Sequence, residues 1–522
     1  MKQMRYMFIL MLFQFFLAGC SDEEEMIIPA PEISGIEEEY TIPEGYQLVL
    51  SPIVANNEQA SYRWLLDGNE VGNTLSYTFS SELPGRFKLV LEVTNEGGKV
   101  QKEVTITVTA KVSDPEVTYV ETKVYTLVEL ASPEYLSEIN QVQWEVISSP
   151  SELYRLSYAE TKTPLFVAAK EGVYTLNVTG GGIIGEVVVI VGKREQQPSP
   201  YIAKVFDYLP APGQFVNKLP EYEEGDTHEV MVRKAGEWLV GEDAWMITLG
   251  GWGGYVVIGF DHTIVNVKGK RDFRINGNAF GSTLGRPGAP FGGSCEPGII
   301  MVAYDKNKNG KPDEDEWYEI KGSANITAGN EPWYPIAVDN GNDVKVIRDY
   351  EMTYHRPTSE EPEEEAQPDN PNAFISIKNY LRWEDNQNGS GYKVKNIYHN
   401  QTYYPAWVDE EQLTYRGIRL PENGINEGEY VPGVNEGNVY FVLYGFRYGY
   451  VDNHPNIQEE SAIDIDWAID KERNKADLPG IDFVKIYNGV NQENGWLGET
   501  STEVERGEDL HLLGKSIDTL TD

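Results

Sequence analysis

Short apolar runs, interrupted at close intervals by glycine, proline, asparagine and aspartate, make up almost all of the chain after residue 30. In many of these runs apolar and polar residues alternate, which places every second side chain on one face of a β-strand. Almost no stretch has the 3.6-residue period of a long amphipathic helix. The chain has only two cysteines, Cys20 and Cys295, so it has no disulfide framework and must be stabilised by burial. We therefore expect an all-β fold.

Segment 31–111 has the strand pattern of a small sandwich. It contains a Tyr-x-Trp run ending at Trp64, a Phe-x-Leu-x-Leu-x-Val run at 87–93 and a closing Val-x-Ile-x-Val run at 104–108, separated by turn residues. This pattern resembles a PKD-type immunoglobulin-like domain. In such a sandwich alternate residues face the gap between two sheets, and the tryptophan fills its centre.

A weaker copy of the same pattern spans 112–193, with Trp144 in its tryptophan strand. The polar, proline-containing segment 194–200 then predicts a linker. Residues 201–522 have no comparable break, and their many short runs predict one large β-sandwich or jelly-roll-like domain with long loops. Segment 358–372, rich in carboxylates and prolines, predicts a solvated insertion in that domain.

The formal net charge of −40 argues against nucleic acid as a partner, because nucleic acid is bound through basic surfaces. The carboxylates suit a soluble surface protein or one that binds cations. No motif of a nucleophilic serine, a zinc protease or a phosphate loop is present. We therefore expect a non-enzymatic protein. A glycosidase that uses two carboxylates is the enzyme alternative, although no pair can be chosen among so many acidic residues.

The start of the chain predicts export and lipid anchoring. Residues 1–19 combine Lys2 and Arg5 with an apolar run that is too short to span a bilayer but suits a secretory signal. The run ends in Leu-Ala-Gly before Cys20, which resembles the box of bacterial lipoproteins, whose acylated cysteine begins the mature protein. The acidic tether 20–30 resembles the signal that sends Bacteroidota lipoproteins to the extracellular face of the outer membrane. An ordinary secretory signal and a merely solvated tether are the alternatives.

Segment 305–316 matches a twelve-residue calcium loop, with oxygen ligands and a glycine at the positions that such a loop requires. The predicted metal ligands are Asp305, Asn307, Asn309, Lys311 through its backbone carbonyl, Asp313 and Glu316. The apolar flanks predict strands rather than the helices of an EF-hand. We therefore expect a lone structural calcium site of modest affinity. A metal-free hairpin turn rich in Asn and Asp is the alternative.

Glycines on both sides of Trp252 leave its ring little cover from its own neighbours. Such a ring can stack on a sugar or another flat ligand. The alternative is that the glycines allow close sheet packing around a core tryptophan. With two further aromatic groups in proline-flanked loops, the candidate ligand-binding residues are Trp252, Tyr255, Trp333, Tyr334, Tyr403, Tyr404 and Trp407.

Four phrases of the C-terminal region, at 250–267, 272–280, 294–323 and 481–512, resemble a family of Bacteroidota cell-surface lipoproteins with PKD-like N-terminal repeats. The family is similar to surface lipoproteins associated with corrinoid (vitamin B12) uptake, some of which bind the vitamin through a C-terminal globular domain. The resemblance implies capture of a cobalamin-like corrinoid, with a TonB-dependent outer-membrane transporter as partner. Carbohydrate binding and a structural or adhesive role are the alternatives.

Overall fold

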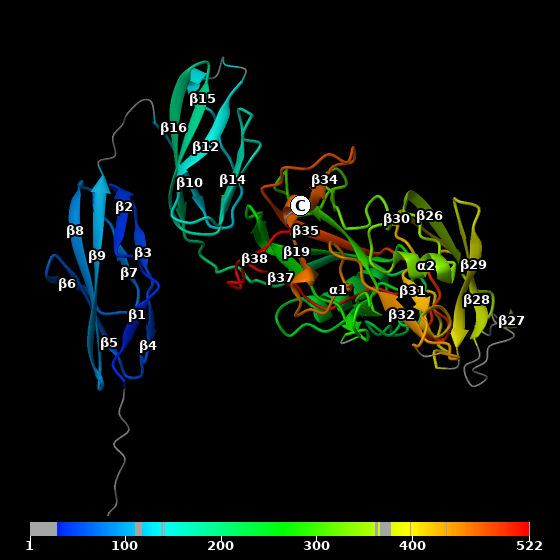
Figure 1. Ribbon diagram of the computed structural model, residues 1–522. Helices are drawn as coiled ribbons and strands as arrows, with labels where there is room; N and C mark the ends of the chain where they lie inside the picture. The colour runs from blue at the N-terminus through cyan, green and yellow to red at the C-terminus, as the bar shows by residue number, and fades with distance from the viewer. Residues whose placement is uncertain are drawn as a thin grey trace, which may run out of the picture. The chain divides into compact units, whose positions relative to one another are not determined.

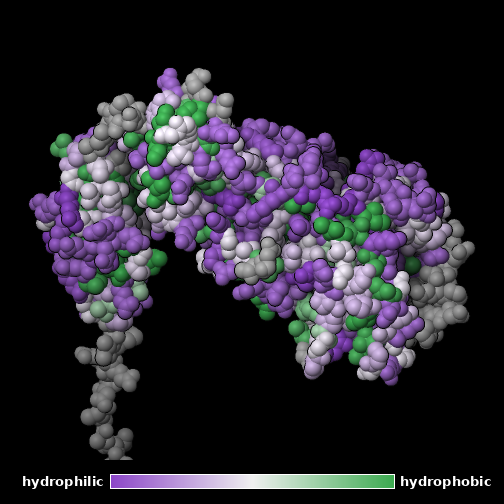
Figure 2. All heavy atoms as spheres, turned by 45° about the horizontal axis from the view of Figure 1, so that its top comes forward, coloured by the Kyte–Doolittle hydropathy of each residue, from purple (hydrophilic) through white to green (hydrophobic). Residues whose placement is uncertain are grey.

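The computed structural model describes residues 29–109, 117–136, 139, 141–284, 286–360, 364–365, 377–396, 398–434 and 436–520 (Figure 1). The predicted signal peptide, Cys20, most of the predicted tether and most of the predicted insertion 358–372 lie outside these residues. No helix in the described ranges is long and apolar enough to cross a membrane. The chain divides into two compact units, 1–114 and 115–522. Hydrophilic residues predominate on the face shown in Figure 2.

The first unit is an immunoglobulin-like sandwich. Its larger sheet has the order β2-β9-β8-β5-β6, and the strand pairs β1-β4 and β3-β7 complete it. Trp64 is fully buried in a core shared with Leu50 and Phe79, and its ring nitrogen donates to Thr74 O at 3.0 Å. The strands are β1 (Glu32–Ser34), β2 (Glu39–Pro43), β3 (Leu48–Leu50), β4 (Ile53–Ala55), β5 (Ser61–Leu66), β6 (Asn69–Gly72), β7 (Tyr77–Phe79), β8 (Gly85–Asn95) and β9 (Gly98–Thr109).

A second sandwich begins the second unit. It pairs a four-stranded sheet, β10-β16-β15-β12, with a three-stranded sheet, β11-β14-β13. Trp144 fills its core, and its ring nitrogen donates to Thr161 O at 2.9 Å. The elements are β10 (Val117–Lys123), β11 (Val128–Glu129), the 3₁₀ turn η1 (Glu134–Leu136), β12 (Gln143–Ser148), β13 (Tyr154–Ser157), β14 (Leu165–Ala168), β15 (Gly172–Gly180) and β16 (Ile183–Gly192). The two predicted tandem sandwiches are confirmed.

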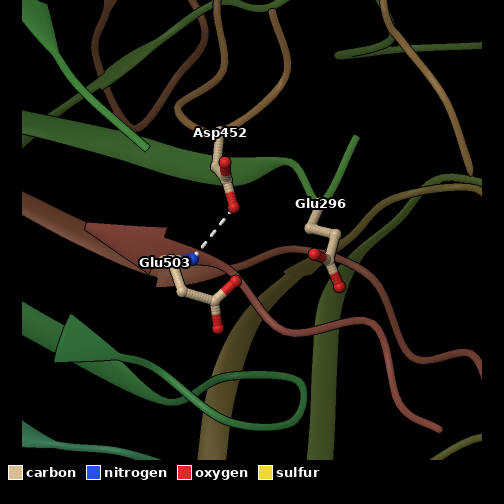
Figure 3. Close-up of side chains that lie close together, drawn as sticks. All are labelled: Glu296, Asp452 and Glu503. Carbon is tan, nitrogen blue, oxygen red and sulfur yellow. Dashed lines mark hydrogen bonds between the residues drawn. The ribbon is translucent and has the colours of Figure 1, made fainter. Parts of the chain in front are cut away.

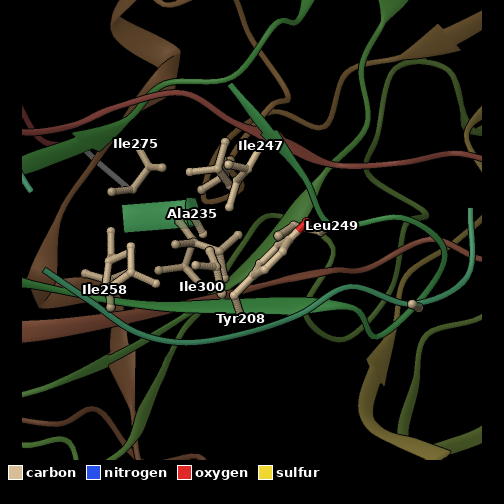
Figure 4. Packing of buried hydrophobic residues seen from close by; sticks show 14 of the residues in the cluster. Tyr208, Ala235, Ile247, Leu249, Ile258, Ile275 and Ile300 are labelled. Atoms are coloured by element: carbon tan, nitrogen blue, oxygen red, sulfur yellow. The ribbon is translucent and has the colours of Figure 1, made fainter. Parts of the chain in front are cut away.

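The rest of the chain forms a large β-rich domain, so the all-β prediction is confirmed. Its central sheet has the order β17-β19-β35-β24-β25-β34, and further sheets run β27-β28-β26-β30, with β29 on β28, and β22-β23-β32-β31. Small sheets complete it: β33-β21-β37, β18-β36 and β20-β38. Figure 4 shows part of its main core, where Tyr208, Ile258 and Ile300 pack together.

The bounds of the strands in this domain are β17 (Lys204–Leu209), β18 (Ile247–Thr248), β19 (Tyr255–Val265), β20 (Lys270–Arg271), β21 (Phe273–Ile275), β22 (Phe280–Gly281), β23 (Gly292–Ser294), β24 (Gly298–Ala303), β25 (Tyr318–Ile320), β26 (Ile347–His355), β27 (Glu364–Glu365), β28 (Ile377–Asp385), β29 (Ser390–Asn396), β30 (Gln412–Arg419), β31 (Gly424–Asn426), β32 (Phe441–Tyr444), β33 (Ala462–Ile463), β34 (Ala468–Ile469), β35 (Gly480–Asn488), β36 (Glu503–Val504), β37 (Gly507–Asp509) and β38 (Ile517–Asp518).

Short helices connect these strands. They are α1 (His228–Leu239), α2 (Tyr334–Asn340), α3 (Glu427–Tyr430) and the 3₁₀ turns η2 (Glu459–Ser461), η3 (Ile465–Trp467) and η4 (Gly495–Leu497). Helix α1 buries Met231, Ala235 and Leu239, spaced four residues apart on one face, in the main core.

The second sandwich packs against the C-terminal domain within the same unit. Val265 and Val267 of the C-terminal domain belong to the core cluster of the sandwich. The Arg155 guanidinium bridges Asp466 and Asp477, at 2.8 Å from an oxygen of each. The junction therefore combines apolar burial with a charged clamp beyond the covalent connection at 194–200.

We predict that Arg155→Ala weakens this junction. Arg155 and Asp466 are mostly buried and Asp477 is about half-exposed. Loss of Arg155 therefore costs hydrogen bonds to charged groups, about 1.5–3 kcal/mol of unfolding free energy. Denaturation of the full chain measures the loss, and faster proteolysis within 194–200 reports the loosening. Lys123→Ala, which removes the exposed pair with Glu195, is the control and should change neither. Equal behaviour of the two variants would show that the clamp contributes nothing.

Candidate functional site

The aromatic residues predicted to bind a ligand do not form an exposed surface. Tyr255 and Tyr334 are half-buried, and the others are buried: Trp252, Trp333, Tyr403, Tyr404 and Trp407. Trp252 has no exposed surface, meets Tyr350 edge-to-face at 4.7 Å between ring centroids, and donates its ring N–H to Ile418 O at 3.2 Å. The expectation of exposed rings is wrong for these five residues.

The glycines around Trp252 explain this result. A Cβ atom at Gly250 would lie 1.9 Å from Ala211 O, and one at Gly253 would lie 2.4 Å from Tyr415 Cβ. Other segments of the fold therefore occupy the space that the missing side chains leave. The alternative of close sheet packing around a core tryptophan is confirmed.

The predicted calcium loop joins β24 to β25, as its apolar flanks indicated. The amides of Asn307 and Asn309 both donate to Asp313 Oδ2, at 2.6 and 2.7 Å, and Asp305 accepts from the backbone N–H groups of Asn309 and Gly310. The amide oxygens of Asn307 and Asn309 accept from Asn309 N and Lys311 N, at 3.0 and 2.8 Å. To present oxygens around Asp313, as a cation would require, both amides would have to turn and lose these bonds.

The remaining predicted ligands of the loop also have other hydrogen-bond partners or are exposed. Glu316 accepts from the backbone N–H groups of Lys306 and Asp313 at 2.8 and 3.1 Å, so it would have to turn to close a calcium shell. Lys311 is exposed and its backbone N–H donates to Asn309 Oδ1 at 2.8 Å. The loop contains ligand oxygens in the predicted order, and calcium binding to it stays a prediction.

We predict that calcium raises the melting temperature of the chelator-treated chain and that Asp305→Asn weakens binding to the loop roughly tenfold, because ligand charge sets affinity. Differential scanning calorimetry over a calcium series measures both effects. Asn at this position keeps one acceptor oxygen, so the metal-free loop should survive. A calcium response that is the same in Asp305→Asn and in the parent chain would place the ion elsewhere.

A second group of acidic side chains lies deeper in the C-terminal domain. Glu296, Asp452 and Glu503 form the one group of three acidic, histidine or cysteine side chains in the described residues whose ligand atoms all lie within 4.8 Å of one another (Figure 3). Glu296 lies between β23 and β24, and Glu503 begins β36. An isolated bridge from Gly298 to Val451 places Asp452 beside them. We call these residues the carboxylate triad.

Neutral donors hold each carboxylate of the triad. Asp452 Oδ1 accepts from the backbone N–H groups of Asn278 and Ala279, at 2.7 and 2.8 Å, and its Oδ2 accepts from Glu503 N at 3.0 Å. The donors to Glu296 are Ser501 N at 2.9 Å and Ser294 Oγ at 3.1 Å.

The Glu503 carboxylate is held in the same way. It accepts from the hydroxyls of Thr248 and Ser501 at 3.1 and 3.0 Å and from Asn278 Nδ2 at 3.2 Å. Within the described part of the chain, no lysine, arginine or histidine nitrogen lies within 4.0 Å of any triad oxygen.

Burial of the three neighbouring carboxyl groups of the triad raises their pKa values. Burial raises the pKa of Glu296 to about 7, against opposing hydrogen bonds from Ser501 and Ser294. Burial also raises the pKa of Asp452 well above its usual value, with the negative charge of Glu296 adding to the effect, and it raises the pKa of Glu503 likewise. Three adjacent carboxylates cannot all ionise in such a place without a compensating cation.

A cavity of about 240 Å³ opens beside the triad; we call it the acidic cavity. Its lining residues are Gln214, Phe215, Leu219, Met246, Asn278, Ser294, Glu296, Leu443, Asn494, Leu497, Glu499, Ser501 and Glu503. Phe215 and Leu497 keep 37 % of their surface exposed, whereas Glu503 is buried.

Three buried acceptor atoms in the lining have no hydrogen-bond partner: Gln214 Oε1, Asn494 Oδ1 and Glu499 Oε2. Buried acceptors are normally satisfied. Asn494 Oδ1 lies against Gly424, where a Cβ atom would be 1.8 Å away. The other two atoms, Gln214 Oε1 and Glu499 Oε2, therefore favour a donor that enters from the cavity side of these residues.

Sequence reasoning missed this cavity because its residues carry no local motif. The triad comes from three separate segments, and each member is one of 83 acidic residues. One local signal was present, because Glu499, Ser501 and Glu503 alternate in a run that ends in a buried strand. That signal alone does not indicate which other carboxylates meet them.

Comparison with known proteins identifies the N-terminal part of the chain. Residues 29–95, which make up most of the first sandwich, match the PKD-like domain family. No curated protein matches the chain.

Solved structures similar to the chain include a chimeric titin Z1Z2 tandem, at 17 % identity over 31 % of this chain and 98 % of that one, with a TM-score of 0.14. A quinonprotein alcohol dehydrogenase-like protein from Bacteroides thetaiotaomicron matches at 15 % identity over 33 % of this chain and 44 % of that one, TM-score 0.15. The insect immune protein hemolin matches at 15 % identity over 34 % and 49 %, TM-score 0.15.

Proposed function

We propose that the chain is a non-enzymatic binding protein whose C-terminal domain captures a small polar group in the acidic cavity. The observation that supports this is a pair of unpartnered acceptors, Gln214 Oε1 and Glu499 Oε2, on residues that line one cavity with a partly apolar lining. Both atoms are acceptors, so a ligand that binds them supplies donors. Amides, amines and hydroxyls meet this requirement.

The cavity also limits what can enter. At about 240 Å³ it lies below the range for sites that enclose a drug-sized ligand, so a whole corrinoid does not fit. One amide side group of a corrinoid fits this donor requirement, and so does one hydroxyl-bearing sugar unit. We therefore keep the corrinoid, on the strength of the sequence resemblance, as the first ligand to test and a glycan as the second.

A glycosidase is a weaker proposal for the same cavity. A retaining pair must flank the sugar with two accessible carboxylates. Asp452 and Glu503 are buried and held by several donors each, and only Glu296 keeps partial exposure.

Titration of the full chain with cyanocobalamin, followed by calorimetry and visible absorption, tests the ligand. Glu499→Gln replaces the unpartnered acceptor with a donor at nearly the same shape, and should reduce affinity about tenfold or more. Glu472→Gln, at an exposed position, should not. Absence of binding at micromolar ligand sinks the corrinoid proposal, and a glycan array then tests the second ligand. Binding that Glu499→Gln leaves unchanged places the site elsewhere.

We further propose that Cys20 carries the lipid and holds the protein on the extracellular face of the outer membrane, where it delivers ligand to a TonB-dependent transporter. The lipoprotein box supports the anchor, and the acidic residues after it support surface display. Radiolabelled palmitate should label the parent chain but not Cys20→Ser. Protease added to intact cells should digest the parent chain, and protection would place it on the periplasmic side.

A further inference from the structure

The carboxylate triad brings together side chains that would repel one another if all were ionised. Their ligand atoms lie within 4.8 Å of one another, which is the span of oxygens across the coordination shell of a hard cation. The backbone and side-chain donors that hold Glu296, Asp452 and Glu503 are all neutral. They fix the positions of the carboxylates but do not compensate their charge.

We propose that Glu296, Asp452 and Glu503 bind a divalent hard cation of the calcium class at the floor of the acidic cavity. Calcium takes six to eight oxygen ligands in a flexible arrangement. The three carboxylates supply the charged ligands. The hydroxyls of Ser294, Ser501 and Thr248, which already contact these carboxylates, lie close enough to contribute or to orient them.

Two unpartnered atoms of lining residues, which also support the proposed ligand site, add to the geometric argument for an ion at this place. Gln214 Oε1 and Glu499 Oε2 belong to residues more than nine-tenths buried, and both residues line the cavity together with Glu296 and Glu503. Water molecules on a bound cation donate hydrogen bonds to surrounding acceptors. A hydrated cation on the triad would supply the donors that these two atoms lack.

The charge of the site decides between a metal ion and an organic ammonium. A divalent cation compensates two of the three carboxylates, whereas an ammonium group compensates only one. The triad therefore favours the divalent cation.

This inference goes beyond ligand capture and does not require it, since it concerns the floor of the cavity and is tested with calcium alone. It is also separate from the predicted calcium loop at 305–316. The experiment therefore uses the full chain carrying Asp305→Asn and Asp313→Asn, which removes two charged ligands of the loop and leaves the triad intact.

Calorimetric titration of this chelator-treated background should show one equivalent of bound calcium. Adding Glu503→Gln should weaken that binding at least tenfold, and the exposed Glu472→Gln should leave it unchanged. In chelator, Glu503→Gln should melt at the same temperature as the background or higher, because the amide has nearly the same shape and carries no charge that the buried site must accommodate. In calcium the order should reverse.

The reversal distinguishes a metal ligand from a residue that merely supports the fold, which would lower the melting temperature in both buffers. If Glu503→Gln fails to fold, the partly exposed Glu296→Gln carries the same expectations. No calcium bound by the background at about 10 mM, beyond the range of extracellular calcium modules, overturns the proposal. Unchanged affinity in the folded glutamine variant also overturns it.

Discussion

Trp252→Ala should lower the free energy of unfolding of the unit 115–522 by about 3–5 kcal/mol, the usual cost of truncating a buried tryptophan. The ring is fully buried, and its loss removes the edge-to-face contact with Tyr350 and leaves Ile418 O without its donor. Surrounding backbone limits collapse of the cavity, because Gly250 already packs against Ala211. Urea denaturation of the full chain, followed by circular dichroism, measures the change.

Trp245→Ala is the matched control for this prediction. Trp245 lies seven positions earlier in the sequence and keeps 62 % of its surface exposed. Its truncation should change stability by less than about 0.5 kcal/mol. A stable Trp252→Ala protein that has lost only ligand affinity would restore the binding role that the sequence suggested for this residue.

The β-architecture could be predicted because its signals are local. Alternating strands and the tryptophans at 64 and 144 identify two sandwiches without any knowledge of distant contacts. The strands that flank the segment 305–316 were predictable for the same reason. Helix α1 was missed because it is only twelve residues long and its apolar run Val230–Val232 also suits a short strand.

The site could not be predicted because it depends on contacts between distant segments. Glu296 and Glu503 are 207 positions apart, and they approach because β24 pairs with β35 while β36 pairs with β18. The glycines beside Trp252 gave an ambiguous signal, since an exposed ring and a tightly packed one require the same missing side chains. Only the positions of Ala211 and Tyr415 decide between them.

Asp464→Asn should stabilise the unit 115–522 at neutral pH and leave it nearly unchanged in acid. Asp464 is buried and accepts from Asp466 N at 2.7 Å and from the Thr519 hydroxyl. Burial, and then the negative charge of Asp272, raises its pKa to about 7.

The direction of the pH effect follows from proton binding. The folded state holds a proton on Asp464 between the pKa of the unfolded chain, about 4, and the folded value near 7. The contribution of Asp464 to the free energy of unfolding is therefore greatest below pH 4 and is lost as the pH rises from 4 through 7. Asparagine is neutral at every pH. By pH 8 the free energy of unfolding of the variant should therefore exceed that of the parent chain by at most about 4 kcal/mol.

The difference between parent and variant isolates Asp464 from the other charged groups around it. Asp272, Asp466, Arg271 and His511 are present in both proteins, so their own titration contributes equally unless it is coupled to Asp464. Asp339→Asn, an exposed change in α2, should reproduce the parent curve. Parallel curves for Asp464→Asn and the parent between pH 5 and 8 would mean that Asp464 is ionised in the folded protein. Arg271 would then have to compensate a buried negative charge that also faces Asp272.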